Sequence, residues 1–423
     1  MTTALSADIP NTAQAPDEQR SLKAELRRSQ RRQKLKALLL TSPLFLFILS
    51  VFVTPIGIML MRSVDNPELS QNWHQTNAAV AQWDGKSLPG DDLFVALAND
   101  IRASKADKTL AKVAKRLNYE LSGMRSLVTR TGRKLAKMPS DPTLEKQRLL
   151  KIHKRWGELE TWQAIKRASG SLTSLYLLGA IDMKQSTDGG IEAVPEDQAI
   201  YKNIFMRTLW ISAVVTAICL VMGFPLAWLL ANTSSNIANL LMIGVLLPFW
   251  TSLLVRTSAW VVLLQKNGLI NDLLIDLSII SEPLILLFNR PGVYIALVHL
   301  LLPFMVLSLY SVMKSISPVY VRAALSLGAT PTEAFFKVYV PQTLPGIAAG
   351  GLLCFILSIG YYITPALIGS PQDQMISYFI AYYTNDLINW GMASALGVVL
   401  LVCCGLLFLI YHRLSTKHDL KMG

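Results

Sequence analysis

Six apolar stretches, each long enough to cross a lipid bilayer, constrain this sequence more than any other feature. A helix of about 20 apolar residues spans the hydrocarbon core and satisfies its own backbone hydrogen bonds there. A hydrophobic content of 52% is also typical of a membrane protein. The sequence therefore predicts an all-α, polytopic membrane protein with six transmembrane helices, near Ala37–Met61, Ile204–Ala231, Ile237–Leu264, Val293–Val312, Leu344–Ile368 and Gly391–Tyr411.

Basic residues at the outer ends of the first and last spans predict the orientation. Six Lys and Arg residues crowd the approach to the first span, and His412, Arg413 and Lys417 follow the last. Positive charges beside a span favour the cytoplasm, so both termini are expected there, as six spans require. We expect residues 1–36 to be a basic, partly disordered cytoplasmic tail, 37–61 the first transmembrane helix, and 412–423 a second cytoplasmic tail.

A polar segment, Ser317–Pro341, lies between the fourth and fifth spans and is expected in the cytoplasm within a loop over residues 313–342. Ser317 before Pro318 is the pattern of a helix start, with a hydroxyl cap and a proline in the first turn. This helix is expected to run to about Leu327. Gly328 then supplies the left-handed residue that ends helices.

A second short helix follows directly. Thr330 and Glu333 have the spacing of a capping box, in which each side chain accepts a hydrogen bond from the other residue's backbone N–H. Pro341 is expected to stop this helix. Two caps, one glycine and two prolines thus predict a stiff helix-turn-helix.

An insertion of residues 62–203 separates the first and second spans and is expected outside the cytoplasm. Apolar residues recur at helical spacing over Leu110–Met124, and again over Leu149–Trp162 after a Ser140-Asp141-Pro142 start. We interpret the insertion as a small helical domain with its own core. Two roles stay open: structural support, and a platform for an extracytoplasmic solute-binding protein.

Within the polar segment, Ala323-Ala324, Gly328, Val338 and Pro341 resemble the EAA loop of inner-membrane permease subunits of binding-protein-dependent ABC importers. The family pattern begins with Glu where this chain has Arg322. In that family the loop is cytoplasmic and fits a groove on the ATPase subunit. The resemblance implies an ATPase-coupling role for Arg322, Ala323, Ala324, Gly328, Ala329 and Pro341.

Further motifs resemble the spermidine/putrescine-type branch of these permeases: Leu247–Ser252, Gly268–Asn271, Leu302–Met305 and Thr364–Gly369. They cover most of residues 204–411, which the resemblance identifies as a permease core of five transmembrane helices with the MetI-like, type I fold. It implies four kinds of partner: a dimer of ATP-binding subunits, a second permease that is a different chain, an extracytoplasmic solute-binding protein, and the lipid bilayer of the cell inner membrane.

This chain is not expected to be an enzyme. Its Gly85-Lys86-Ser87 lacks the earlier glycine of a phosphate-binding loop, because Val80 stands there, and it lies in the extracytoplasmic insertion. ATP and Mg are therefore expected on the partner ATPase, with no cofactor on this chain. The four Cys fall inside apolar spans and the five His are scattered singly, so no metal site is expected.

The resemblance implies polyamines, putrescine or spermidine, or a related small organic solute. The six spans contain no Asp or Glu, although a cation needs carboxylates or aromatic faces along its route. A solute such as an amino-acid or opine derivative is therefore the alternative. The candidates for lining the path are Trp250, Arg256, Trp260, Tyr361, Tyr362 and Asn385. For Arg256 we favour another role, binding backbone carbonyls or the neighbouring subunit, because a fixed cation repels a cationic solute.

The sequence argues against three other classes of protein. An ion-coupled secondary transporter commonly has repeated halves and ionisable residues at mid-membrane, and neither is visible in the sequence. A receptor needs a cytoplasmic signalling module, for which the tail after Tyr411 is too short. The formal net charge of +12 is not attributed to nucleic-acid binding, because no nucleic-acid motif accompanies it.

Overall fold

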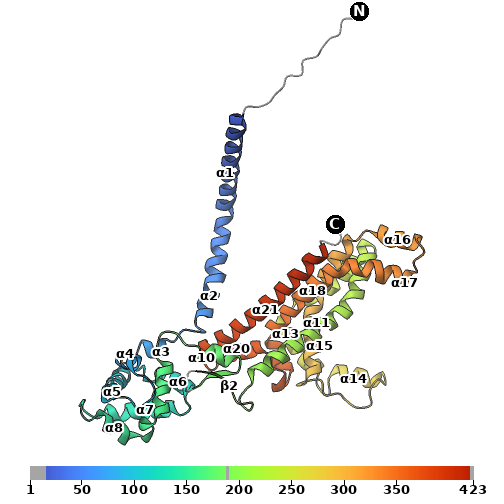
Figure 1. The fold of residues 1–423 in the computed structure, drawn as a ribbon. Coiled ribbons are helices and arrows are strands. Elements are labelled where there is room, and N and C mark those ends of the chain that lie inside the picture. The colour runs from blue at the N-terminus through green and yellow to red at the C-terminus, as the bar shows by residue number, and fades with distance from the viewer. Residues whose placement is uncertain (1–15, 187–189, 420–423) are drawn as a thin grey trace, which may run out of the picture. The chain divides into compact units, whose positions relative to one another are not determined.

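The computed structural model describes residues 16–186 and 190–419, which are mostly helical (Figure 1). Two units are distinguished, residues 1–59 and 60–423. The first contains α1 (Pro16–Ile48), a π-helical turn η1 (Leu49–Val53) and most of α2 (Thr54–Met61). Residues 1–15 of the tail expected to be partly disordered lie outside the described residues, and α1 begins at Pro16, well before the first span.

The described residues contain five helices long and apolar enough to cross a membrane, and one bent pair that makes up to six. This confirms a polytopic, all-α membrane protein. The five are Ser29–Met61, α11 (Tyr201–Asn232), α15 (Arg290–Ser315), the helix over Pro331–Gly360 that includes α18 (Val340–Gly360), and the start of α21 (Trp390–Asp419).

Helices α11, α15 and α18 form the centre of the membrane core. Their shared apolar cluster includes Val215, Leu301 and Met305, all fully buried. Small residues let α18 approach α15 closely: a Cβ added at Gly350 would lie 2.9 Å from the Met305 sulfur, and one added at Gly346 would lie 3.0 Å from Val312 Cβ.

The third span is not the continuous helix expected over Ile237–Leu264. It consists of α12 (Ser235–Leu246), the 3₁₀ turn η3 (Leu247–Trp250) and α13 (Leu253–Leu263), bent by 96°. Pro248 cannot donate a backbone hydrogen bond, and the extended Ser252 starts a new helix by accepting the N–H of Val255 at 3.2 Å.

The fifth span also ends earlier than Ile368. Helix α18 stops at Gly360, Tyr361 is extended, and Ile363–Ile368 forms the separate short helix α19. Helix α19 packs against α13, where the hydroxyls of Thr257 and Thr364 lie 3.3 Å apart. The Thr364–Gly369 motif therefore lies beside the membrane core's broken helix and not within a straight span.

Shorter elements lie at the two ends of the core helices (Figure 1). The hairpin helices α16 (Pro318–Ser326) and α17 (Pro331–Glu333) lie at one end. The insertion, α14 (Leu269–Asp276) and α20 (Ile376–Asn385) lie at the other, with the 3₁₀ turn η5 (Pro371–Asp373) preceding α20. The predicted coupling loop and the insertion are thus separated by the length of the spans.

The insertion is a helical domain with a core of its own. Trp73, Trp156 and Trp162 are fully buried in it, together with Phe94 and Leu117. Its helices are α3 (Pro67–Ser70), α4 (His74–Gln82), α5 (Asp91–Ala106), α6 (Leu110–Glu120), α7 (Met124–Leu135), α8 (Glu145–Ile152), η2 (Lys154–Gly157), α9 (Leu159–Ala168) and α10 (Leu175–Ala180). A small antiparallel pair, β1 (Met183–Gln185) and β2 (Ile191–Ala193), follows, with Met183 opposite Ala193.

Neither predicted helical run in the insertion is a single helix. The apolar series over Leu110–Met124 divides between α6 and α7, because Gly123 has a φ of 88° and breaks the helix there. The series over Leu149–Trp162 divides among α8, η2 and α9. The apolar positions nevertheless face one core, since Leu110, Leu149 and Trp162 are all buried.

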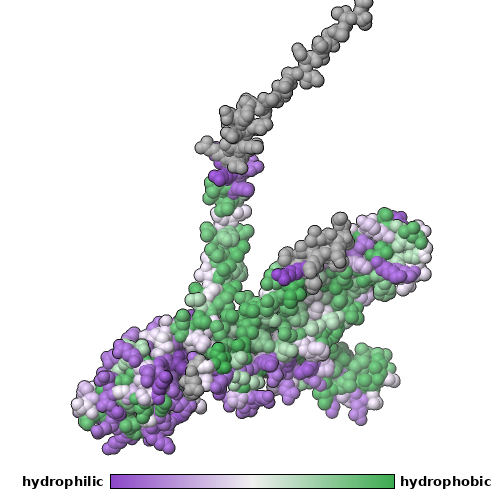
Figure 2. Space-filling model, in the orientation of Figure 1, coloured by the Kyte–Doolittle hydropathy of each residue, from purple (hydrophilic) through white to green (hydrophobic). Residues whose placement is uncertain are grey.

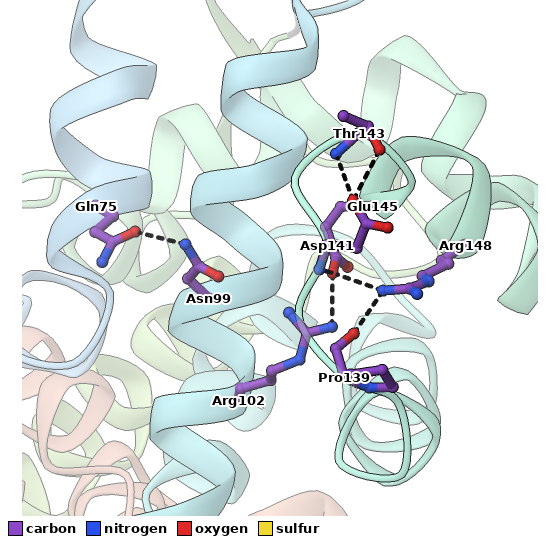
Figure 3. A network of polar contacts seen from close by, with 8 residues as sticks. All are labelled: Gln75, Asn99, Arg102, Pro139, Asp141, Thr143, Glu145 and Arg148. Carbon is purple, nitrogen blue, oxygen red and sulfur yellow. Dashed lines mark hydrogen bonds and ion pairs between the residues drawn. The ribbon is translucent and has the colours of Figure 1, made fainter.

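A buried carboxylate joins two parts of this domain (Figure 3). Glu145 is fully buried and pairs with Arg102 of α5 at 2.7 Å and with Arg148 at 3.1 Å. It also accepts the backbone N–H of Asp141 at 3.1 Å. The hydrogen bonds from Thr143 hold the pKa of the neighbouring Asp141 carboxyl below its ordinary value.

We predict that Glu145→Ala destabilises the insertion by about 3 kcal/mol, because Arg102 and Arg148 lose their shared buried counter-charge. The matched variant Lys146→Ala removes the exposed pair with Asp91 and a cation–π contact with the Phe94 ring, and it should cost less than about 1 kcal/mol. Pulse proteolysis of the full-length chain in detergent, following cleavage within the insertion, measures both. Equal resistance of the two variants would contradict the role of Glu145.

Candidate functional site

The hairpin has the caps that the sequence predicts. Ser317 Oγ accepts the N–H of Val319 at 3.4 Å, and Gly328 has a φ of 90°. Thr330 Oγ1 accepts the N–H of Glu333 at 3.3 Å, while the Glu333 carboxylate accepts the N–H of Thr330 at 3.1 Å. These bonds fix the turn between α16 and α17 from within, without help from the rest of the chain.

The second hairpin helix does not stop near Pro341, so that expectation is wrong. The helix continues from Pro331 to Gly360 through a π-helical turn, η4 (Ala334–Tyr339). In this turn the N–H of Val340 bonds the carbonyl of Phe335, five residues back. A proline in an α-helix clashes with the carbonyl four residues before it, and the wider turn gives Pro341 room. The hairpin is therefore one continuous piece with the fifth span.

Aromatic contacts fasten the hairpin to the core. Phe335 makes edge-to-face contacts with Phe224 and Trp228 of α11, with ring centroids 6.3 and 6.2 Å apart. It also stacks on the buried Tyr339 at 5.6 Å. The hairpin therefore packs against the membrane helix α11 and is continuous with α18.

The opposite side of the hairpin exposes large apolar side chains. Leu327 is 89% exposed and Tyr320 is 57% exposed. Arg322, the residue that differs from the family pattern, is also exposed, together with Ala323 and Gly328. Helix α16 buries none of its residues. An exposed apolar surface on so rigid an element is typical of a protein interaction site.

One of the predicted path residues, Trp260, contacts His299. The indole N–H of Trp260 donates to His299 Nδ1 at 3.2 Å, with the rings edge to face at 5.4 Å. Arg256 lies one helical turn before Trp260 on α13, and Tyr361 follows the end of α18. Sequence reasoning missed His299, because a lone histidine in an apolar span has no spacing that relates it to Trp260.

Arg256 is half-buried, and its Nε has no hydrogen-bond partner among the described residues. Trp250 is 74% exposed at the bend of the broken third span, Tyr362 is 39% exposed, and Asn385 is exposed at the end of α20. Within the described residues, no side-chain hydrogen bond or ring contact joins these last three to Arg256, Trp260 or His299.

An ion pair holds the loop that follows α19. Arg290 Nε lies 2.8 Å from Asp373 Oδ1, and Asp373 also accepts the hydroxyl of Ser370 at 2.6 Å. Burial alone raises the pKa of the Asp373 carboxyl, but the hydrogen bonds from Ser370 and Arg290 outweigh it and lower the pKa overall. The ionised Asp373 therefore stabilises this loop at pH values above the ordinary pKa of Asp. This stabilisation is lost as the pH falls from there through the lowered pKa of Asp373.

A cavity of about 740 Å³ lies where the insertion meets the start of α21. Lys115 Nζ donates to the carbonyl of Leu387 at 2.7 Å, and the Arg62 guanidinium lies 5.3 Å from the centre of the Trp390 ring. The lining carries both signs of charge, from Asp65, Glu68, Arg62, Lys112, Lys115 and Arg116. No pattern in the sequence predicts this junction, because its two groups of residues, 62–176 and 388–391, are more than two hundred positions apart.

The chain is 33% identical over 224 residues to the "Spermidine/putrescine transport system permease protein PotB" of Salmonella typhimurium (strain SL1344), covering 53% of this chain and 78% of that protein. It is 32% identical over 227 residues to the "Inner membrane ABC transporter permease protein YdcU" of Escherichia coli (strain K12), covering 50% and 72%.

A solved structure of a bacterial alginate ABC transporter, with an alginate-bound periplasmic protein, matches 51% of this chain and 78% of its own chain, at 19% identity and a TM-score of 0.43. The model of the family "Binding-protein-dependent transport system inner membrane component" matches residues 198–418 and leaves the insertion unmatched. Because this match covers more than half of its sequence, the chain belongs to the family of inner-membrane components of binding-protein-dependent transport systems.

Proposed function

We propose that this chain is the transmembrane permease subunit of an ATP-driven, binding-protein-dependent importer of polyamines in the cell inner membrane. The observation that carries the proposal is the hairpin: an internally capped element that exposes Leu327 and Tyr320 and continues without a break into the fifth span. The name of the relative PotB, a spermidine/putrescine transport system permease protein, supports the solute class.

The hairpin would act as a lever. Both termini and the hairpin lie in the cytoplasm in this proposal, where a dimer of ATP-binding subunits holds ATP and Mg. When those subunits close, a rigid hairpin moves as one body and carries α18 with it, and through Phe335 it also carries α11. Arg322, Ala323, Ala324, Gly328, Ala329 and Pro341 are the residues proposed for this coupling.

The partly exposed side chain of Arg256 supports a contact with a second permease, a different chain, on the other side of the path. A buried guanidinium is costly in hydrocarbon unless it is paired. Arg256 would also repel a polyamine if it faced the route directly. We therefore assign the route to aromatic faces such as Tyr361, and the choice of solute mainly to the solute-binding protein.

We predict that Gly328→Val abolishes uptake but leaves membrane insertion intact, because a β-branched residue is strained at a φ of 90°. A Cβ at this position meets no atom within 4 Å, so the effect is one of backbone conformation and not of a clash. Gly328→Asn, which tolerates the left-handed region, should retain much of the uptake. Normal ATP-coupled uptake by Gly328→Val would argue against the lever.

Leu327→Asp should lower the amount of ATPase that co-purifies with this chain by about tenfold, because it places a charge in the apolar centre of the proposed interface. Leu88→Asp is the matched control, since Leu88 is also an exposed leucine, at 52%, but lies in the insertion. Quantitative blotting of the purified complex gives the ratio. If the two variants retain equal ATPase, the docking surface lies elsewhere.

The transport proposal is tested by uptake of radiolabelled putrescine and spermidine into cells that lack other polyamine importers and express the complete system. Uptake is expected to stop when the partner ATPase carries an inactive catalytic site, and to continue in ATP-loaded vesicles treated with a protonophore. Loss of uptake with the protonophore would favour an ion-coupled carrier. Uptake of an amino-acid or opine derivative instead would overturn the solute and keep the ATP-driven mechanism.

A further inference from the structure

The middle of the insertion has a net positive charge almost as large as that of the whole chain. From Lys105 to Arg155 there are 15 Lys and Arg residues against four Asp and Glu residues, a net charge of +11, compared with +12 for the whole sequence. Two of the four acids are already engaged: Glu120 pairs with Arg116 and Arg167, and Glu145 pairs with Arg102 and Arg148. The remaining cations are therefore poorly compensated.

Helix α7 concentrates this charge on one face. Its apolar residues, Met124, Leu127, Val128 and Leu135, are at most 2% exposed and belong to the core of the insertion. Its exposed residues are Arg125, Ser126, Arg130, Arg133 and Lys134, with Lys137 just after its end. None of the arginines on this face forms an ion pair within the described residues. The insertion has an extensive hydrophilic surface (Figure 2).

A shallow groove of about 470 Å³ runs along this face. Its lining is made up of Asn118, Gly123, Arg125, Ser126, Thr129, Arg130 and Arg133. Among the residues that the structure describes, no carboxylate lines this groove. Asn118 Oδ1 accepts the N–H groups of Gly123 and Arg125 at 3.0 and 3.3 Å, which fixes the start of α7 and hence the position of its first arginine.

We propose that this groove, with Arg125, Arg130 and Arg133, is a docking site for an acidic surface of the solute-binding protein that delivers the solute to this permease. The inference rests on the proposed function, because it requires such a partner outside the cytoplasm. Arginines suit this role, since each guanidinium can bind a carboxylate through two parallel hydrogen bonds. Clustered charge of one sign also speeds the encounter of two proteins.

Two other occupants fit the groove less well. A polyamine is itself a cation and is repelled by three arginines. A lipid surface is normally bound by a helix that inserts its apolar face among the acyl chains, and the apolar face of α7 is buried inside the insertion. The spread of cations over α6, α7 and α8 also exceeds the size of one small anion, which favours a protein surface.

The test uses the full-length importer in nanodiscs and the purified putrescine- or spermidine-binding protein of the same cell, with affinity measured by interferometry. The variant Arg125→Gln/Arg130→Gln/Arg133→Gln should bind the binding protein about tenfold more weakly at low salt, because it loses three exposed ion pairs with that partner. The difference should shrink as salt rises, because salt screens exposed charges. The partner should also protect these three arginines from trypsin.

The control variant Lys86→Gln/Lys184→Gln/Lys202→Gln removes the same charge at exposed positions on other elements and should bind as the unaltered chain does. If the arginine variant binds as tightly as the control, the docking inference is wrong while the proposed function stands. If the unaltered importer binds neither binding protein, both fail. Trypsin protection that needs phosphatidylglycerol in the nanodisc, and no partner, would assign the face to the membrane and overturn the inference.

Discussion

The interior of a bilayer offers no water, so every backbone N–H and carbonyl in a spanning segment must find a partner within the protein. This requirement applies in particular where a proline, which has no N–H to donate, lies in a spanning helix. Two prolines, Pro55 and Pro341, each follow a π-helical turn, and in both cases the residue before the proline donates its N–H to a carbonyl five positions back: Thr54 to Leu49, and Val340 to Phe335. The wide turn lets a helix pass a proline without leaving the helical path.

The same constraint explains where helices do break. At residues 251–252 the third span turns by 96°, and the hydroxyl of Ser252 caps the new helix that begins there. At Gly360 the fifth span ends, and α19 continues beside α13. Both breaks lie against other parts of the core, where buried side chains such as Thr257 and Thr364 face each other. Broken helices of this kind are tolerated where protein surrounds them.

Local chemistry was readable from the sequence, and tertiary packing was not. The caps at Ser317 and Thr330 and the left-handed Gly328 depend on neighbours within a few residues, so their spacing predicts them correctly. The positions of the spans and the apolar core of the insertion follow from composition and period. The helix was wrongly predicted to stop near Pro341 because a proline usually ends a helix, and a π-helical turn has no recognisable pattern in the sequence. Two features could be found only in the folded chain. One is the contact between Trp260 and His299, and the other is the clustering of charge on the face of α7 opposite its buried apolar residues.

The π-helical turn of η4 also sets how the hairpin is rotated about the helix axis relative to α18. Each residue in an α-helix advances the direction of its side chain by about 100°, so the extra residue in a wide turn rotates everything on one side of it relative to the other. Phe335 thereby reaches α11 while Gly350 meets α15 on the far side of the turn. Deleting one residue from this turn would change the length of the helix very little. It would, however, rotate the exposed Leu327 about the axis of the helix that ends at Gly360. The extra residue in this turn therefore sets the orientation of the hairpin, whereas the caps set its stiffness.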